Sequence, residues 1–151
     1  MLDDLDRRIL RIWQAETSLS PAELAERCAV TPGKAARRIA RMQDAGVIEG
    51  ISAMVDWATL GYSVEVSLRI TLDKTVARAF DDFLVAAREV PEVTEIQTFL
   101  GRVDVRLNII ARDMAHYQNI YRSRILTLPH IAEIEALMQI ARIKAEEALP
   151  L

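Results

Sequence analysis

The 151-residue chain has few of the residues that cross-link small secreted domains or build metal centres. Its single cysteine, Cys28, can form no internal disulfide, which favours a reducing compartment such as the cytoplasm. Its two histidines, His116 and His130, are separated and have no cysteine partners, so they form no metal-binding pattern. We therefore expect a cytoplasmic protein that carries no metal and no other cofactor.

Long apolar runs and the marks of a signal peptide are also absent. No run approaches the roughly 20 apolar residues that cross a bilayer. The chain starts with MLDDLD, which is acidic where a signal peptide would be basic. No Gly-rich phosphate loop, nucleophile elbow or pair of carboxylates in a cleft is recognisable. We expect no membrane partner and no enzymatic activity, in a globular chain that is 51% hydrophobic and can bury a core.

The most informative segment is a short basic helix that begins after Thr31. Thr31 can cap the helix, Pro32 suits its first position, and Gly46 suits the residue after its end. A second short helix with the same Ser-Pro start precedes it at residues 20–28. Two short helices joined by a tight turn, the second of them basic, predict a helix-turn-helix.

The basic helix also predicts a partner, double-stranded DNA. The net charge of −3 does not indicate nucleic acid, but no acidic residue interrupts the cations of this helix. A cationic helix has the size and charge that a major groove accepts. We expect base-edge contacts from Lys34 and Arg37, phosphate contacts from Arg38 and Arg41, and a cap that also contacts phosphate from Thr31. Two alternatives stay open: a solvated helix face, or pairing of Arg38 or Arg41 with an acid such as Glu23 or Glu26.

Residues 1–55 are predicted to form one winged helix-turn-helix domain. A first helix over residues 3–14 has apolar side chains at helical spacing on one face. Residues 47–51 and 52–55 are β-rich, and Gly50 between them suits a tight turn, so they predict a short hairpin, or wing. Residues 56–61 are predicted to be a short helical turn and linker.

Residues 62–151 are predicted to form a second domain. Residues 63–72 alternate strictly between apolar and polar side chains, which is typical of a half-buried strand. The elements expected after it are a helix over 75–89, strands over 93–100 and 103–111, a helix over 113–126 and a strand over 131–140. This βαββαβ order predicts a ferredoxin-like domain, so the chain as a whole is α+β.

The predicted sheet leaves one face without helices. Phe99, Ile110 and Leu137 suggest that both faces carry apolar residues. We therefore expect a second subunit to cover the open face and form an obligate dimer, sheet against sheet.

Together these segments resemble the Lrp/AsnC (feast/famine) transcriptional regulators. The motifs are LDDLDRRIL from residue 2, LSPAELAER from residue 19, Thr31-Pro32 followed by RRIARM, then GVI from residue 46 and ISAMVD from residue 51. The resemblance implies a sequence-specific regulator of transcription whose dimers bind inverted half-sites. It also implies further assembly of the dimers, to octamers, and a small-molecule effector such as an amino acid.

The resemblance further implies an effector pocket at a turn that the family usually writes G-D-x-D-Y. This chain has Gly101-Arg102-Val103-Asp104-Val105, so it keeps the glycine and the second aspartate. Arg102 would favour a carboxylate or another anion, or it could form a structural pair with Asp104. By position, the turn side of the pocket comprises Thr98, Leu100, Gly101, Arg102, Val103 and Asp104, and Met114, Met138 and Gln139 could complete it.

Two other functions remain open. Some proteins with this two-domain plan resemble siroheme decarboxylases, whose chemistry would need histidines or arginines around a cavity. Neither histidine of this chain lies in the winged segment or the linker, and the basic helix favours DNA. A sensor that has lost DNA binding is the third possibility.

Overall fold

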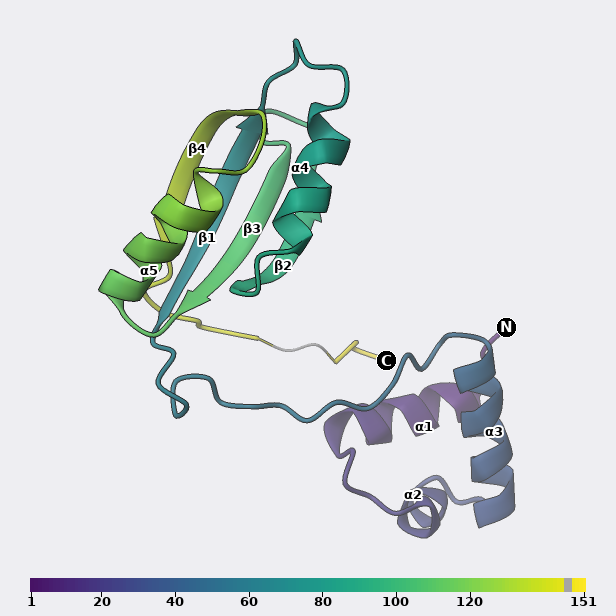
Figure 1. The fold of residues 1–151 in the computed structure, drawn as a ribbon. Helices are drawn as coiled ribbons and strands as arrows, with labels where there is room; N and C mark the ends of the chain where they lie inside the picture. Colours follow the sequence, from purple (N-terminus) through teal and green to yellow (C-terminus); the bar gives the residue numbers. More distant parts are fainter. Residues whose placement is uncertain (146–147) are drawn as a thin grey trace. The chain divides into compact units, whose positions relative to one another are not determined.

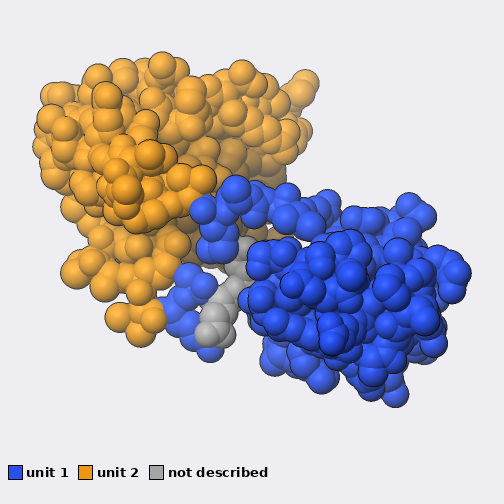
Figure 2. All heavy atoms as spheres, turned by 90° about the horizontal axis from the view of Figure 1, so that it is seen from below, with its two compact units in different colours: residues 1–54, 144–151 blue, residues 55–143 orange. Residues whose placement is uncertain are grey.

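A computed structural model describes residues 1–145 and 148–151 of the chain. The chain divides into two compact units, which Figure 2 colours separately. The first unit comprises residues 1–54 and 144–151, and the second comprises residues 55–143. The C-terminal residues, expected in the second domain, thus group with the first unit. There the backbone N–H of Leu149 donates to Gln14 Oε1 at 2.8 Å.

The first unit contains the three predicted helices, each started by a capping side chain. Asp3, Ser20 and Thr31 each accept a backbone N–H from the residue three positions later. In the first two cases the carboxylate at that later position bonds back to the cap, which completes a capping box. The helices are α1 (Asp4–Ala15), α2 (Pro21–Arg27) and α3 (Pro32–Asp44).

A small core holds these helices together. Ile9 of α1, Leu24 of α2 and Met42 of α3 are all buried and pack in one cluster with Cys28. Burial raises the pKa of the Cys28 thiol, which makes it an apolar core residue rather than a nucleophile. Gly46 follows the end of α3 with φ of +70°, the left-handed geometry that favours glycine.

The predicted wing is wrong. Residues 47–55 contain no strand, and Ile51 and Met54 are exposed, with 62% and 95% of their surface accessible. An isolated two-stranded hairpin is marginal in water without a further layer to pack on. The β-rich composition of this segment was therefore not enough to form the hairpin.

The second unit has the predicted ferredoxin-like fold. Its strands form one antiparallel sheet in the order β2-β3-β1-β4, and α4 and α5 lie on the same face of it (Figure 1). The strands are β1 (Val64–Leu72), β2 (Val93–Thr98), β3 (Val105–Ala111) and β4 (Ile131–Met138). The helices are α4 (Ala79–Arg88) and α5 (Met114–Ile120), and a π-helical turn (Tyr121–Ile125) continues α5.

Helix α4 starts later than the predicted residue 75. The Asp73 carboxylate accepts the backbone N–H of Thr75 at 2.9 Å and its hydroxyl at 2.7 Å, which closes a turn ahead of the helix. Phe83 of α4 is fully buried and belongs to the core cluster that also contains Leu68 of β1 and Leu107 of β3. Within the described residues, no helix is both long and apolar enough to cross a bilayer.

The open face of the sheet is mostly polar, which corrects the expectation drawn from Phe99, Ile110 and Leu137. Strands β1 and β3 bury every second residue under the helices, so their alternate residues face water. Those alternate residues include Arg69 of β1, whose guanidinium lies 3.9 Å from the Glu135 carboxylate of β4. Ile110 and Leu137 are half-buried exceptions, and Phe99 lies beyond the end of β2.

Candidate nucleic-acid interface and ligand pocket

Helix α3 presents two cations to solvent. Thr31 Oγ1 accepts the backbone N–H of Lys34 at 3.3 Å and so fixes the first turn. Ala35 and Met42 face the core, whereas Lys34 and Arg37 are exposed. Neither Lys34 nor Arg37 makes an ion pair with any other residue that the structure describes. Both side chains are therefore available to an anionic partner.

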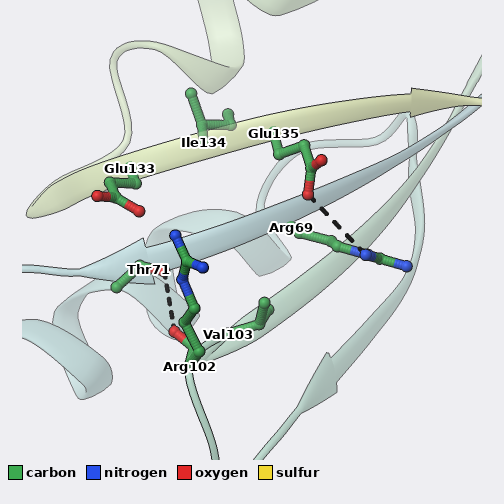
Figure 3. A pocket seen from close by; sticks show the side chains of 7 residues that line it. All are labelled: Arg69, Thr71, Arg102, Val103, Glu133, Ile134 and Glu135. Carbon is green, nitrogen blue, oxygen red and sulfur yellow. Dashed lines mark hydrogen bonds and ion pairs between the residues drawn. The ribbon is translucent and has the colours of Figure 1, made fainter.

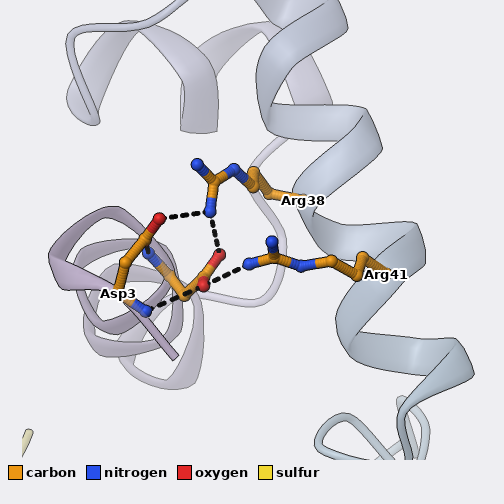
Figure 4. A network of polar contacts seen from close by, with 4 residues as sticks. Asp3, Arg38 and Arg41 are labelled. Atoms are coloured by element: carbon orange, nitrogen blue, oxygen red, sulfur yellow. Dashed lines mark hydrogen bonds and ion pairs between the residues drawn. The ribbon is translucent and has the colours of Figure 1, made fainter. Parts of the chain in front are cut away.

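The other two predicted DNA-binding arginines are held by α1 (Figure 4). Arg38 Nη1 donates to Asp3 Oδ2 at 2.5 Å and to Asp6 Oδ1 at 3.2 Å. Arg41 Nη2 donates to the second oxygen of Asp6. These charge-assisted bonds reduce the number of N–H groups of Arg38 and Arg41 that are free to bind phosphate.

The acidic partners are Asp6 of α1 and its capping residue Asp3, not Glu23 and Glu26 of α2. Asp6 is fully buried, and Asp3 is half-exposed. The backbone N–H of Asp6 and, next in importance, the guanidinium of Arg38 hold the pKa of Asp3 at about 2. Arg38 therefore faces an Asp3 carboxylate that is ionised at neutral pH.

Small side chains beside Arg37 are functional candidates that sequence reasoning missed. Gly33, Ala36 and Ala40 are all exposed on α3, and no atom lies within 4 Å of a Cβ added to Gly33. Residues spaced by three, four and seven positions share one side of a helix. The sequence feature that indicates them is the spacing of these small residues by three, four and seven positions. This spacing gives α3 an outer face that can approach another surface closely.

The predicted effector turn borders a hollow of about 470 Å³ in the second unit (Figure 3). Gly101 has φ of +153°, a backbone conformation that L side chains rarely adopt. Thr71 Oγ1 donates to the Arg102 carbonyl at 3.0 Å, and the Arg102 side chain points across β1 toward Glu133. The lining residues are Arg69, Thr71, Arg102, Val103, Glu133, Ile134 and Glu135, of which only Arg102 and Val103 were predicted.

Asp104 serves the fold and does not pair with Arg102. Its carboxylate accepts the backbone N–H of Leu72 at 2.8 Å and forms an ion pair with Lys74. The Lys74 ammonium is the main cause that lowers the pKa of Asp104. Among the described residues the ion-pair partner of Asp104 is thus Lys74, which leaves the Arg102 guanidinium to the hollow.

One chain does not bring the two groups of predicted effector residues together. Thr98 ends β2, and Leu100 and Gly101 follow it in the turn beside the Thr71 end of β1. Met138 pairs with Val66 near the other end of β1, and Gln139 donates to the Glu65 carbonyl there. Met114 starts α5 just after β3, whose last residue also pairs at that far end.

Two models of protein domains match this chain. An AsnC-type helix-turn-helix domain matches residues 2–43, and an Lrp/AsnC ligand binding domain matches residues 65–149. The first match covers α1, α2 and α3 except the last residue of α3. The second covers the hollow and the sheet except the first residue of β1.

Similar proteins include known regulators. The proline dehydrogenase transcriptional activator of Rhodobacter capsulatus is 33% identical over 87% of this chain and 86% of its own length. The leucine-responsive regulatory protein of Escherichia coli is 27% identical over 98% of this chain and 90% of its own length.

Solved structures of transcriptional regulators have the same fold as this chain. A transcriptional regulator of Neisseria meningitidis in complex with L-Met has a TM-score of 0.92 and 25% identity, over 99% of this chain and 97% of that one. Escherichia coli AsnC has a TM-score of 0.88 and 27% identity, over 96% of each chain. These names favour a regulator over the siroheme-decarboxylase alternative. By its two matched domains, the chain belongs to the Lrp/AsnC family of transcriptional regulators.

Proposed function

We propose that this regulator acts in the cytoplasm and reads double-stranded DNA with α3. The observation that carries the proposal is the outer face of α3, where Lys34 and Arg37 are exposed and unpaired within the described structure. Arg37 is flanked by Ala36 and Ala40, so its guanidinium can reach a base edge without steric hindrance from its neighbours. Pro32 has no N–H, and Thr31 accepts the N–H groups of Lys34 and Ala35, so the backbone N–H of Gly33 is the amide at the start of α3 that suits a phosphate.

Arg38 and Arg41 have a smaller part in the proposed interface. Asp3 and Asp6 already occupy some of their N–H groups, so only the remaining groups can contact phosphate. The Arg41 side chain is 53% exposed and that of Arg38 only 24%. Arg41 is therefore the better phosphate contact of the two.

A recognition helix of this length reads only a short half-site, so we propose that homodimers bind inverted half-sites and assemble further, up to octamers. The split of the predicted effector residues between the two ends of the sheet supports an assembly in which neighbouring copies complete one pocket.

The effector that fits the hollow is an amino acid or a related small carboxylate. Arg102 offers a planar pair of donors for a carboxylate, and Glu133 and Glu135 on the same hollow offer partners for an ammonium group. The regulator of Neisseria meningitidis that shares this fold was solved with L-Met, an amino acid.

The test of DNA binding is fluorescence anisotropy with the DNA upstream of the protein's own coding sequence and a scrambled duplex, across a salt series. We expect tighter binding to the first duplex and a linear fall of log affinity with log salt, by about 0.9 per phosphate contact. Arg37→Ala should remove the preference between duplexes. Arg88→Ala removes an exposed cation from α4 and should leave that preference unchanged.

Equal weak binding to both duplexes, repeated with a panel of amino and organic acids and unaltered by Arg37→Ala, would reject the proposed interface. For the effector, titration calorimetry with amino acids should lose its heat signal in Arg102→Gln. The signal should persist in Arg88→Gln, which changes charge by the same amount.

A further inference from the structure

A buried carboxylate lies against the proposed DNA-reading helix, and the interface described above does not use it. Asp6 of α1 has no exposed surface, yet each of its oxygens accepts a hydrogen bond from an arginine of α3. Its Oδ2 also accepts the backbone N–H of Asp3 at 3.0 Å. One side chain thus ties the start of α1 to two successive turns of α3.

Stability alone is a weak reason for such a group. Burying a carboxylate is expensive, and buried ion pairs replaced by well-packed apolar residues often leave a protein equally stable or more stable. The specific effect of Asp6 is electrostatic and geometric. It directs the guanidinium groups of Arg38 and Arg41 toward α1, while Arg37 stays outside this network.

A cation of a DNA-reading helix that contacts only phosphate does not distinguish one sequence from another. Contacts to phosphate raise affinity for every duplex, and only contacts to base edges separate one site from another. The network sets the two carboxylates of Asp3 and Asp6 against the two guanidinium groups of Arg38 and Arg41. The network therefore lowers the part of the attraction that is independent of sequence.

We propose that Asp6 is a specificity-determining residue, which limits the contact of Arg38 and Arg41 with phosphate so that discrimination depends mainly on Arg37 and Lys34. This inference rests on the proposed function, namely that α3 reads DNA. Asp6 acts through the two arginines and touches no base itself, so its role is that of a positioning residue.

The main variant is Asp6→Asn, which keeps the size of the side chain and one acceptor oxygen but removes the charge. An arginine released to phosphate adds about 0.9 to the salt slope, which is on the order of an eightfold gain in affinity at 0.1 M salt. We expect scrambled duplex to bind about eightfold tighter, with a smaller gain for the preferred duplex. The ratio between the two affinities should therefore fall.

The matched control is Asp4→Asn, an exposed acid on the same helix that makes the same change in charge. It should leave both the slope and the ratio near their wild-type values. The double variant Asp6→Asn, Arg41→Gln should lose the added slope, because the released arginine is then absent. A merely structural role of Asp6 would not produce that reversal.

All variants are full-length chains, checked for folding by circular dichroism and measured by anisotropy on both duplexes. If Asp6→Asn has the slope and ratio of Asp4→Asn, the inference is wrong. Should Asp6→Asn fail to fold, Arg41→Gln with Asp6 intact replaces it: because Arg41 Nη2 already donates to Asp6, its loss should lower the salt slope by much less than about 0.9. A full loss of about 0.9 in Arg41→Gln would then overturn the inference. Failure of the wild type to prefer either duplex would instead reject the proposed function.

Discussion

Asp104 and Lys74 allow a buried hydrogen bond to be weighed against an exposed ion pair. Asp104→Ala removes the acceptor of the Leu72 N–H, which lies in β1 under the helices. Leaving a buried donor unsatisfied costs about 1–3 kcal/mol. The Lys74 side chain is 68% exposed, so its pair with Asp104 contributes only about 0–1 kcal/mol. We expect Asp104→Ala to destabilise the second unit by about 1–4 kcal/mol, from the sum of these effects.

Asp104→Asn and Lys74→Met should each cost less than about 1 kcal/mol, because both keep an acceptor for Leu72. The assay is amide hydrogen exchange of β1, which reports on this unit without assuming that the whole chain unfolds in one step. Since the pKa of Asp104 is lowered, its ionic contribution is present at neutral pH and is lost as pH falls through that depressed value. A loss in Lys74→Met as large as that in Asp104→Ala would refute this ranking.

Three further predictions concern single side chains. Gly33→Ala should stabilise the first unit by about 0.5–1 kcal/mol in thermal melts, because Gly33 is helical and no atom lies within 4 Å of an added Cβ. Gly33→Leu should weaken DNA binding in anisotropy measurements, because its larger side chain crowds the outer face of α3. The ionised Asp3 stabilises the fold above the pKa that it has in the unfolded chain, about 4, and this stabilisation is lost as the pH falls towards its folded pKa of about 2. Asp3→Asn should therefore show a smaller loss of stability between about pH 4 and pH 2 in urea titrations. Phe83→Ala should cost about 3–5 kcal/mol in the exchange of sheet amides, and a loss below about 1 kcal/mol would contradict its place in the core.

Much of the fold could be predicted because its signals are local. The caps at Asp3, Ser20 and Thr31 lie within three residues of the amides that they satisfy, so the starts of the helices follow from short segments. The strict alternation in β1 predicts a strand with one buried face. The βαββαβ order then fixes the topology of the sheet.

The parts that could not be predicted depend on residues far apart in the chain. Asp6 and Arg41 are 35 positions apart, and Asp104 and Lys74 are 30 apart. No local pattern shows which cation will meet which acid. The missing wing has a similar cause, because a hairpin needs a further surface to pack on, and composition does not supply one. The lining of the hollow could not be predicted for the same reason, because Arg69 and Glu133 come together there only through the pairing of β1 with β4.

The separation of Arg102 from Met138 along β1 has a consequence for how the regulator would sense its surroundings. If the Met138 end of one copy completes the Arg102 hollow of another, a bound effector and a neighbouring protein molecule each increase the affinity for the other. The effector concentration needed for half occupancy would then fall as the protein becomes more abundant. A cell could set the sensitivity of such a sensor by how much of the protein it makes, without changing a single residue of the pocket.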